Sequence, residues 1–225
     1  MVSTEKVKSR NNLKNRKKSP NLILRLGFLF FILGGCFLIL ILHSSIEKEI
    51  WYFFNRLPKN TPVYIEYYDE APKEDSAIVA ADPYFSIVIP KIGVNAKIIQ
   101  DVDPFNSWEY QQKLATGIAH ASETALPDET GNSFYFAHSS DNFYNANRYN
   151  AVFYLLNKLE NEDVFYIIFN KRKYTYKVIE AKFVSAEALE YISNNVDKQT
   201  ATLMTCWPPG TDIKRLVVVG ELYEL

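Results

Sequence analysis

The chain has 225 residues, of which 48% are apolar, and this is enough for one good-sized hydrophobic core. The net charge of −1 conceals an asymmetry. Residues 1–25 contain eight Lys or Arg and one acidic residue, which leaves 17 basic and 25 acidic residues, a net charge of −8, in the remainder. Such an acidic globular part argues against a nucleic-acid groove.

The N-terminal region predicts a membrane anchor. Residues 1–21 form a basic tail, and residues 22–42 form an apolar segment that contains 17 uncharged residues from Leu26 to Leu42. A helix over residues 22–42 is about 30 Å long, which matches the hydrocarbon core of a bilayer. A cleaved signal peptide and a buried core helix are the alternatives, although no small-x-small cleavage site follows. The basic tail predicts a cytoplasmic N-terminus, with everything after His43 outside the membrane.

Residues 43–80 are predicted to be an extracytoplasmic spacer. It begins with an amphipathic stretch around Trp51 to Phe54, whose aromatic side chains are typical of a membrane interface. It continues into a segment rich in Pro, Asp, Glu and Lys. The sequence leaves two alternatives for residues 56–80, a flexible tether and a lid folded over an active site.

Residues 81–225 predict a mainly β domain. Short alternating or β-branched runs between turn residues indicate eight strands, and eight strands in this length suggest a closed barrel rather than an open sheet. Short helices are expected at 107–113, 150–158 and 186–194, the last with Ser185 as its N-cap, and Asn170 to Arg172 should form a hairpin turn. The expected strands are 85–89, 95–99, 114–118, 133–138, 164–169, 173–184, 201–206 and 215–222.

Cys206 is the cysteine that suggests chemistry. Cys36 falls in the apolar segment, so Cys206 has no partner for a disulfide in its own compartment. An unpaired thiol in an oxidising exterior is a candidate nucleophile, although a lone Cys at a strand end is more often a small buried hydrophobe.

Two further residues complete an acyl-transfer site. His138 ends a strand-like run and Arg215 opens another. In such a site a thiolate attacks a carbonyl, an imidazole protonates the departing amine, and a guanidinium holds the developing oxyanion. Taken singly, His138 is as easily a capping or surface residue, and Arg215 a surface charge or a partner of Asp212 or Glu221.

The motifs around these residues resemble the sortases, the membrane-anchored cysteine transpeptidases of bacterial cell surfaces. Thr202-Leu203-Met204-Thr205-Cys206 is similar to their Thr-Leu-x-Thr-Cys signature, and Arg215-Leu216-Val217-Val218 is similar to the Arg-Leu-Val-Val that follows it. Upstream, residues 87–96 are similar to the opening strand and turn of the family. Residues 117–139 resemble the stretch that leads to its catalytic His. The resemblance covers about residues 84–223, and one departure is Ala137, where the family often has Gly before its His.

This resemblance implies an eight-stranded sortase barrel and a two-step exchange that needs no metal or cofactor. Cys206 is expected to cleave a Leu-Pro-x-Thr-Gly-like sorting signal after Thr and to form a thioester. An amine of a cell-wall precursor or a pilin lysine then resolves this thioester. By resemblance His138 and Arg215 take the His and Arg roles, Thr205 lines the substrate groove, and His120 is the rival to His138 and a second candidate substrate contact.

Other enzyme families fit less well. An L,D-transpeptidase has Gly before its Cys and Arg two residues after it, where this chain has Thr205 and Pro208. Papain-like wall peptidases place Cys before His, the reverse of the order here. A membrane-tethered β-domain that scaffolds surface proteins without catalysis is the non-enzymatic alternative. The sequence leaves open the sortase subclass, the preferred sorting signal, the acceptor and the oligomeric state.

Overall fold

The computed structural model describes residues 20–55, 61–65, 78–139, 151–192 and 197–224. The chain forms two compact units, Met1–His43 and Ser44–Leu225. Most of the basic tail predicted for residues 1–21 lies outside the described residues, as do residues 56–60 and 66–77 of the predicted spacer. The catalytic domain expected over residues 81–225 falls wholly within the second unit.

The first described element is a long helix, α1 (Pro20–Phe54). It contains the apolar segment predicted as the anchor and continues through the first residues of the predicted spacer. Within the described part of the chain, no helix reaches the combined length and apolarity that crossing a membrane requires. The transmembrane helix therefore stays a prediction.

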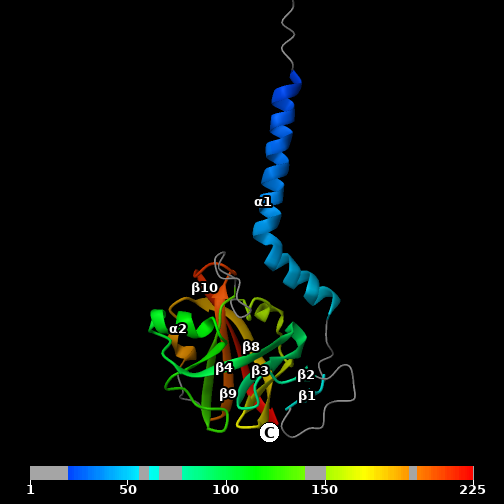
Figure 1. Cartoon of the computed structure of the whole chain (residues 1–225). Helices are drawn as coiled ribbons and strands as arrows, with labels where there is room; N and C mark the ends of the chain where they lie inside the picture. Colours follow the sequence, from blue (N-terminus) through cyan, green and yellow to red (C-terminus); the bar gives the residue numbers. More distant parts are fainter. Residues whose placement is uncertain (1–19, 56–60, 66–77, 140–150, 193–196, 225) are drawn as a thin grey trace, which may run out of the picture. The chain divides into compact units, whose positions relative to one another are not determined.

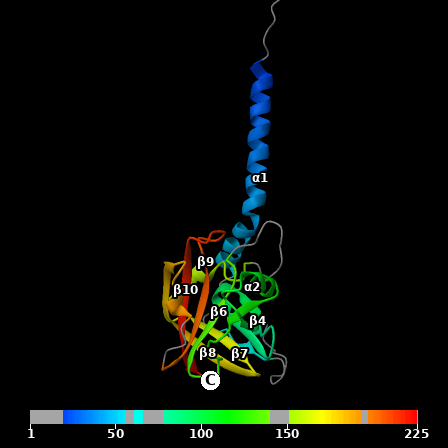
Figure 2. The same ribbon diagram turned by 90° about the vertical axis from the view of Figure 1, so that its left-hand side faces the viewer.

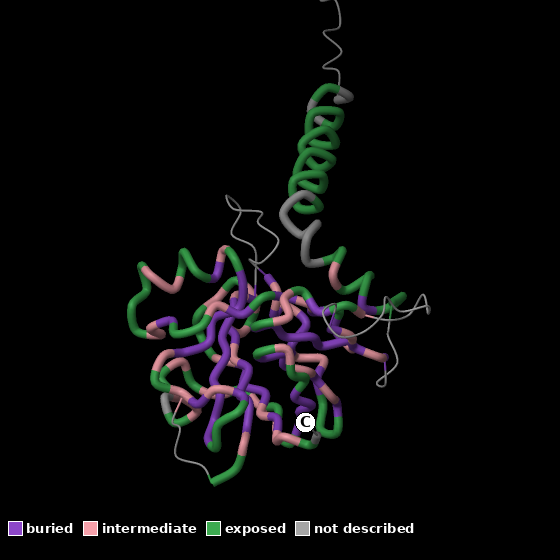
Figure 3. The backbone as a smooth tube through the Cα atoms, turned by 60° about the horizontal axis from the view of Figure 1, so that its bottom comes forward, coloured by how far each residue is buried: buried purple, intermediate pink, exposed green. Residues whose placement is uncertain are grey.

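The second unit contains the expected barrel of eight strands, in the order β10-β8-β7-β3-β4-β5-β6-β9 (Figure 1). Figure 3 shows that its strands hold most of the buried residues. The barrel strands are β3 (Phe85–Ile89), β4 (Val94–Val102), β5 (Ile118–Ala121), β6 (Gly131–Phe136), β7 (Val164–Phe169), β8 (Arg172–Ser185), β9 (Gln199–Trp207) and β10 (Lys214–Glu224).

Local sequence explains several of these boundaries. Asn170 and Lys171 both have positive φ, 47° and 64°, which is the backbone form of a two-residue hairpin turn between β7 and β8. The helix α2 (Ser107–Leu114) begins where the side chain of Asn106 accepts a hydrogen bond from the backbone N–H of Glu109. The turn and this helix were both expected from the sequence.

Three expected elements are wrong in detail. The strand predicted for 114–118 begins only at Ile118, because Leu114 ends α2 and is buried from the helix. The helix predicted for 150–158 is a series of turns followed by the short 3-10 helix η2 (Leu156–Lys158), and residue 150 lies outside the described range. Within the described part of the helix predicted for 186–194, only the 3-10 helix η3 (Leu189–Tyr191) forms, and residues 193 and 194 lie outside the described range. Ser185 pairs with Lys214 at the end of β8 instead of capping a helix.

The described part of the spacer is packed against the barrel. Two short strands, β1 (Val63–Tyr64) and β2 (Ile78–Val79), pair in parallel. Val63 and Ile65 form a small apolar cluster with Val88 of β3 and Ile168 of β7. The remaining short helix, η1 (Pro90–Ile92), joins β3 to β4.

Candidate active site

Three neighbouring strands carry the predicted acyl-transfer residues. The central strand β9 pairs in parallel with β6 and antiparallel with β10, and Figure 2 shows the three strands side by side. β9 contains Cys206, β10 contains Arg215, and His138 follows the end of β6. The fold therefore brings together three segments that are far apart in sequence.

Cys206 and Arg215 are direct cross-strand partners in the β9–β10 ladder. Residues directly opposite each other in an antiparallel pair project from the same face, with Cβ atoms about 4.5–5.5 Å apart. The thiol and the base of the guanidinium side chain therefore share one face and one level of the sheet.

His138 follows the last register pair between β6 and β9 by two residues. Phe136 is the register partner of Met204, and the N–H of Ala137 extends the ladder by donating to the carbonyl of Met204 at 3.2 Å. Two residues further along each strand are His138 and Cys206. Parallel partners face the same way and neighbouring strands lie about 4.8 Å apart, so this register, continued two residues beyond Phe136, would put imidazole and thiol on one face.

Thr205 holds these two strand ends together. Its hydroxyl donates to the carbonyl of Ala137 at 2.7 Å, so the residue before Cys206 is bonded to the residue before His138. The Thr205 side chain is buried. This geometry favours a role in positioning, whereas the expected role in lining a substrate groove stays a prediction.

The environments of the three side chains differ. Cys206 is a free, half-buried thiol. Burial lowers the pKa of His138 from its ordinary value of 6.5, and its carbonyl accepts a hydrogen bond from the N–H of Phe153 at 3.2 Å. A lowered pKa makes the imidazolium form a stronger acid toward a leaving amine.

The Arg215 guanidinium makes backbone bonds at the β9–β10 turn. Its Nη1 donates to the carbonyls of Asp212 at 3.1 Å and Lys214 at 3.2 Å. Among the described ion pairs, Glu221 is bonded to Lys198 at 2.8 Å rather than to Arg215. A guanidinium has five N–H donors, so these two bonds leave donors for a negatively charged oxygen.

His120 occupies a different environment. It is 3% exposed, its Nε2 lies 3.0 Å from the carbonyl of Ala125, and its ring packs beside Tyr135. His120 is the register partner of Tyr135. Tyr135 and Phe136 are consecutive residues of β6, so their side chains point to opposite faces of the sheet. Burial lowers the pKa of His120. The structure therefore favours a structural role for His120, whereas the pairing of His138 with Cys206 stays a prediction.

An apolar row that the sequence analysis did not single out lies next to the catalytic level. Phe136, Met204 and Val217 are successive partners across β6, β9 and β10. Tyr110 of α2 packs edge-on against Phe136, with ring centroids 5.9 Å apart. Each strand alone shows an apolar residue at this position in the sequence. Only the register between the strands shows that the three residues lie side by side.

Asn132 lies in the stretch that resembles the family, but the sequence assigned no role to it. Its side-chain oxygen accepts hydrogen bonds from the hydroxyls of Thr200 at 3.1 Å and Thr202 at 2.7 Å, and its amide donates to the carbonyl of Tyr191 at 2.8 Å. These bonds fasten β6 to β9 and to η3. In the described part of the chain no group of three or more His, Cys, Asp or Glu is placed to hold a metal ion.

Comparisons with known proteins identify the family of this domain. The family model of the sortase domain matches residues 87–223. Sortase D of Bacillus subtilis (strain 168) is 24% identical over 136 residues, which is 59% of this chain and 60% of that protein. The chain thus spans less than two thirds of the length of this relative.

Solved structures agree with that assignment. Sortase C-1 from Actinomyces oris has a TM-score of 0.54 and 28% identity, over 64% of this chain and 77% of that chain. The Clostridium perfringens sortase D5 transpeptidase has a TM-score of 0.51 and 28% identity, over 64% of this chain and 80% of that chain. With its matching motifs, barrel and family model, the chain belongs to the sortase family.

Proposed function

We propose that the protein is a cysteine transpeptidase that cleaves a sorting signal and transfers the acyl part to an amine. The observation that supports this most directly is the register of β6, β9 and β10. Cys206 is the cross-strand partner of Arg215, and the β6–β9 register, continued two residues beyond Phe136, supports His138 as their neighbour.

The proposed reaction has two steps. The Cys206 thiolate attacks the scissile carbonyl, and Arg215 donates to the oxyanion that forms. The tetrahedral intermediate collapses as His138 protonates the departing amine, which leaves a thioester on Cys206. An acceptor amine then attacks the thioester, loses a proton to His138, and releases the thiolate.

The donor substrate in this proposal is a Leu-Pro-x-Thr-Gly-like signal. Met204, a half-buried apolar side chain one level from the nucleophile, supports apolar residues in the donor. The acceptor is an amine of a cell-wall precursor or a pilin lysine. A similar structure, 25% identical with a TM-score of 0.53, is described as sortase C1 of GBS Pilus Island 1.

The proposed location is the outer face of the cell membrane. Residues 22–42 form a single anchor, the N-terminus is cytoplasmic, and the catalytic domain is extracytoplasmic. The apolar sequence of this segment and the basic residues before it support this arrangement.

A substrate screen tests the function. The protein is incubated with a library of sorting-signal peptides and a mixture of amine acceptors, and the products are identified by mass spectrometry. The proposal predicts products that join a donor acyl group to an acceptor. If every peptide stays intact while the folded protein's Cys206 resists a membrane-impermeant alkylating reagent, the non-catalytic scaffold function replaces it.

A further inference from the structure

The last turns of α1 form part of the catalytic unit. Residues from Ser44 onward belong to the same compact unit as the barrel. Lys48 Nζ donates to the carbonyl of Ala151 at 3.3 Å, and Glu49 forms an ion pair with Lys158 at 3.0 Å. Tyr52 is buried. This segment of the helix is therefore fastened to the barrel.

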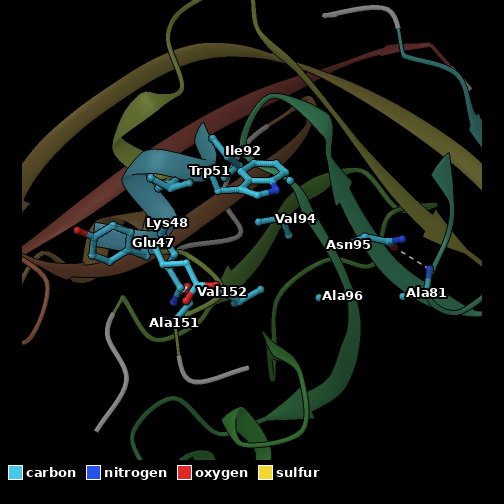
Figure 4. Close-up of a pocket in the computed structure, with 13 residues that line it drawn as sticks. Glu47, Lys48, Trp51, Ala81, Ile92, Val94, Asn95, Ala96, Ala151 and Val152 are labelled. Atoms are coloured by element: carbon cyan, nitrogen blue, oxygen red, sulfur yellow. Dashed lines mark hydrogen bonds between the residues drawn. The ribbon is translucent and has the colours of Figure 1, made fainter. Parts of the chain in front are cut away.

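Trp51 provides the tightest of these contacts. Gly93, which ends η1, has φ of 66°, and a Cβ atom added there would overlap the six-membered ring of the Trp51 indole. Figure 4 shows Trp51 beside Ile92, and Lys48 near Ala151. The helix and the barrel together line a cavity of about 700 Å³, so the helix contacts the barrel through a few anchors around this space.

The opposite face of the same helical segment is apolar and exposed. Ile46 is 44% exposed, Ile50 53%, Phe53 73% and Phe54 76%. At about 100° per residue these four positions fall within one arc of the helix, and the anchors Lys48, Trp51 and Tyr52 fall on the other side. We call these four residues the outer stripe.

The composition of the outer stripe indicates what covers it. Phe53 and Phe54 contact each other edge to face, with centroids 5.2 Å apart, and form a large aromatic surface. The segment contains three charged residues, Glu47, Lys48 and Glu49, so electrostatic attraction contributes little. Large aromatic and aliphatic side chains on one face of a helix are typical of insertion at the boundary between lipid head groups and acyl chains.

The position of the outer stripe points to the same occupant. It begins four residues after Leu42, on the helix that contains the uncharged run from Leu26 to Leu42. We propose that the outer stripe inserts into the interface of a lipid bilayer, while Trp51 and Tyr52 hold the barrel on the other side of the helix. The inference rests on the proposed membrane attachment, which brings a bilayer to this segment.

This arrangement would give the catalytic unit a fixed relation to the membrane surface. A flexible tether lets a domain rotate freely, whereas a helix bonded to the barrel on one face and inserted in lipid on the other does not. This segment of the helix would thus connect the barrel rigidly to the surface of the bilayer.

Site-directed spin labelling of the full chain tests the proposal. Cys36 and Cys206 are replaced by Ser, and single cysteines are introduced by Ile46→Cys, Ile50→Cys and Phe53→Cys. Each labelled protein is reconstituted into vesicles of phosphatidylcholine and phosphatidylglycerol. Collisions with oxygen, which concentrates in lipid, are compared with collisions with a water-soluble nickel chelate. Trp108→Cys on α2 is the matched control, because Trp108 is also 76% exposed.

The proposal predicts more frequent collisions with oxygen than with the nickel chelate at positions 46, 50 and 53, and the reverse order at position 108. Nickel accessibility at the three stripe positions equal to that at position 108 would overturn it. Spin–spin broadening among those three would also overturn it, because the stripe would then join two copies of the chain. Leu33→Cys reports the anchor separately. A label exposed to water there would refute the proposed anchor even if the stripe contacts lipid.

Discussion

The hydroxyl of Thr205 and the carbonyl of Ala137 are joined by a 2.7 Å hydrogen bond, and each residue directly precedes a proposed catalytic residue. Thr205 is followed by Cys206 and Ala137 by His138. The bond therefore joins the two segments that contain the proposed nucleophile and the proposed acid.

Replacing Thr205 by Val should separate these two strand ends. The variant keeps the shape of the side chain but leaves the Ala137 carbonyl without its donor, which costs about 1–3 kcal/mol when the group is buried. We expect kcat to fall about tenfold or more, with a smaller change in KM, because positioning rather than binding is lost.

Thr205→Ser is the control for this change, because it retains the hydroxyl. Steady-state kinetics with a cleavable sorting-signal peptide should show most of the activity restored in Thr205→Ser. If Thr205→Ser and Thr205→Val lose equal activity, the hydrogen bond is not what positions the site.

Arg215→Lys should remove most of the activity although it keeps the positive charge. A lysine ammonium is a compact point charge and cannot reproduce the planar set of N–H donors of a guanidinium. Loss of an oxyanion donor typically lowers kcat by about 10²–10³-fold. Lys214→Arg, at the neighbouring exposed position, is the control and should stay near wild type. Wild-type kcat in Arg215→Ala would refute the role of Arg215.

Gly93→Ala should loosen the contact between α1 and the barrel. The residue at 93 has φ of 66°, where a side chain costs about 1 kcal/mol, and the added Cβ meets the Trp51 ring. We expect a loss of about 2 kcal/mol or more in the free energy of unfolding, measured with urea. In a Trp51→Ala background the same change should cost only the backbone strain. Additive effects of the two substitutions would show that Gly93 and Trp51 do not interact.

The stability of the fold should depend on pH through His120, which is buried, and His138, which is half-buried. Burial lowers the pKa of both His120 and His138 from 6.5. In the pH interval below 6.5 the unfolded chain binds more protons than the folded chain, so the free energy of unfolding rises with pH. Urea unfolding between about pH 5 and 7 measures this slope. His120→Gln should reduce this slope, and an unchanged slope would show that the pKa of His120 is the same in the folded and unfolded chains.

Most of the barrel could be predicted from alternation and turn residues. The prediction of a strand at 164–169 and a turn at Asn170 and Lys171 is confirmed. The run of β-branched and aromatic residues stops at Phe169, and the next two residues have positive φ. The strand expected at 114–118 was misplaced because Leu114 is apolar in either a helix or a strand. Ser185 looked like a helix cap, but pairing with Lys214 extended β8 through it.

The site was only partly accessible from sequence. Chemistry and family resemblance selected Cys206, His138 and Arg215, but nothing local to His138 indicates which residue of β9 lies beside it. The parallel register of β6 and β9 supplies that information, and it depends on contacts between residues 68 positions apart, as the bond between Thr205 and Ala137 does. The antiparallel register of β5 and β6 pairs His120 with Tyr135 and explains why His120 lies in the core instead.

Mass spectrometry of the protein after incubation with a sorting-signal peptide, without any amine acceptor, tests the central claim most directly. The account predicts that the intact mass increases by the acyl part of the peptide, that digestion maps the adduct to Cys206, and that an added amine releases it as a transpeptidation product. Cys206→Ala should show no adduct. Peptide cleavage by the wild-type protein without an adduct, or with an adduct elsewhere than Cys206, would contradict the account.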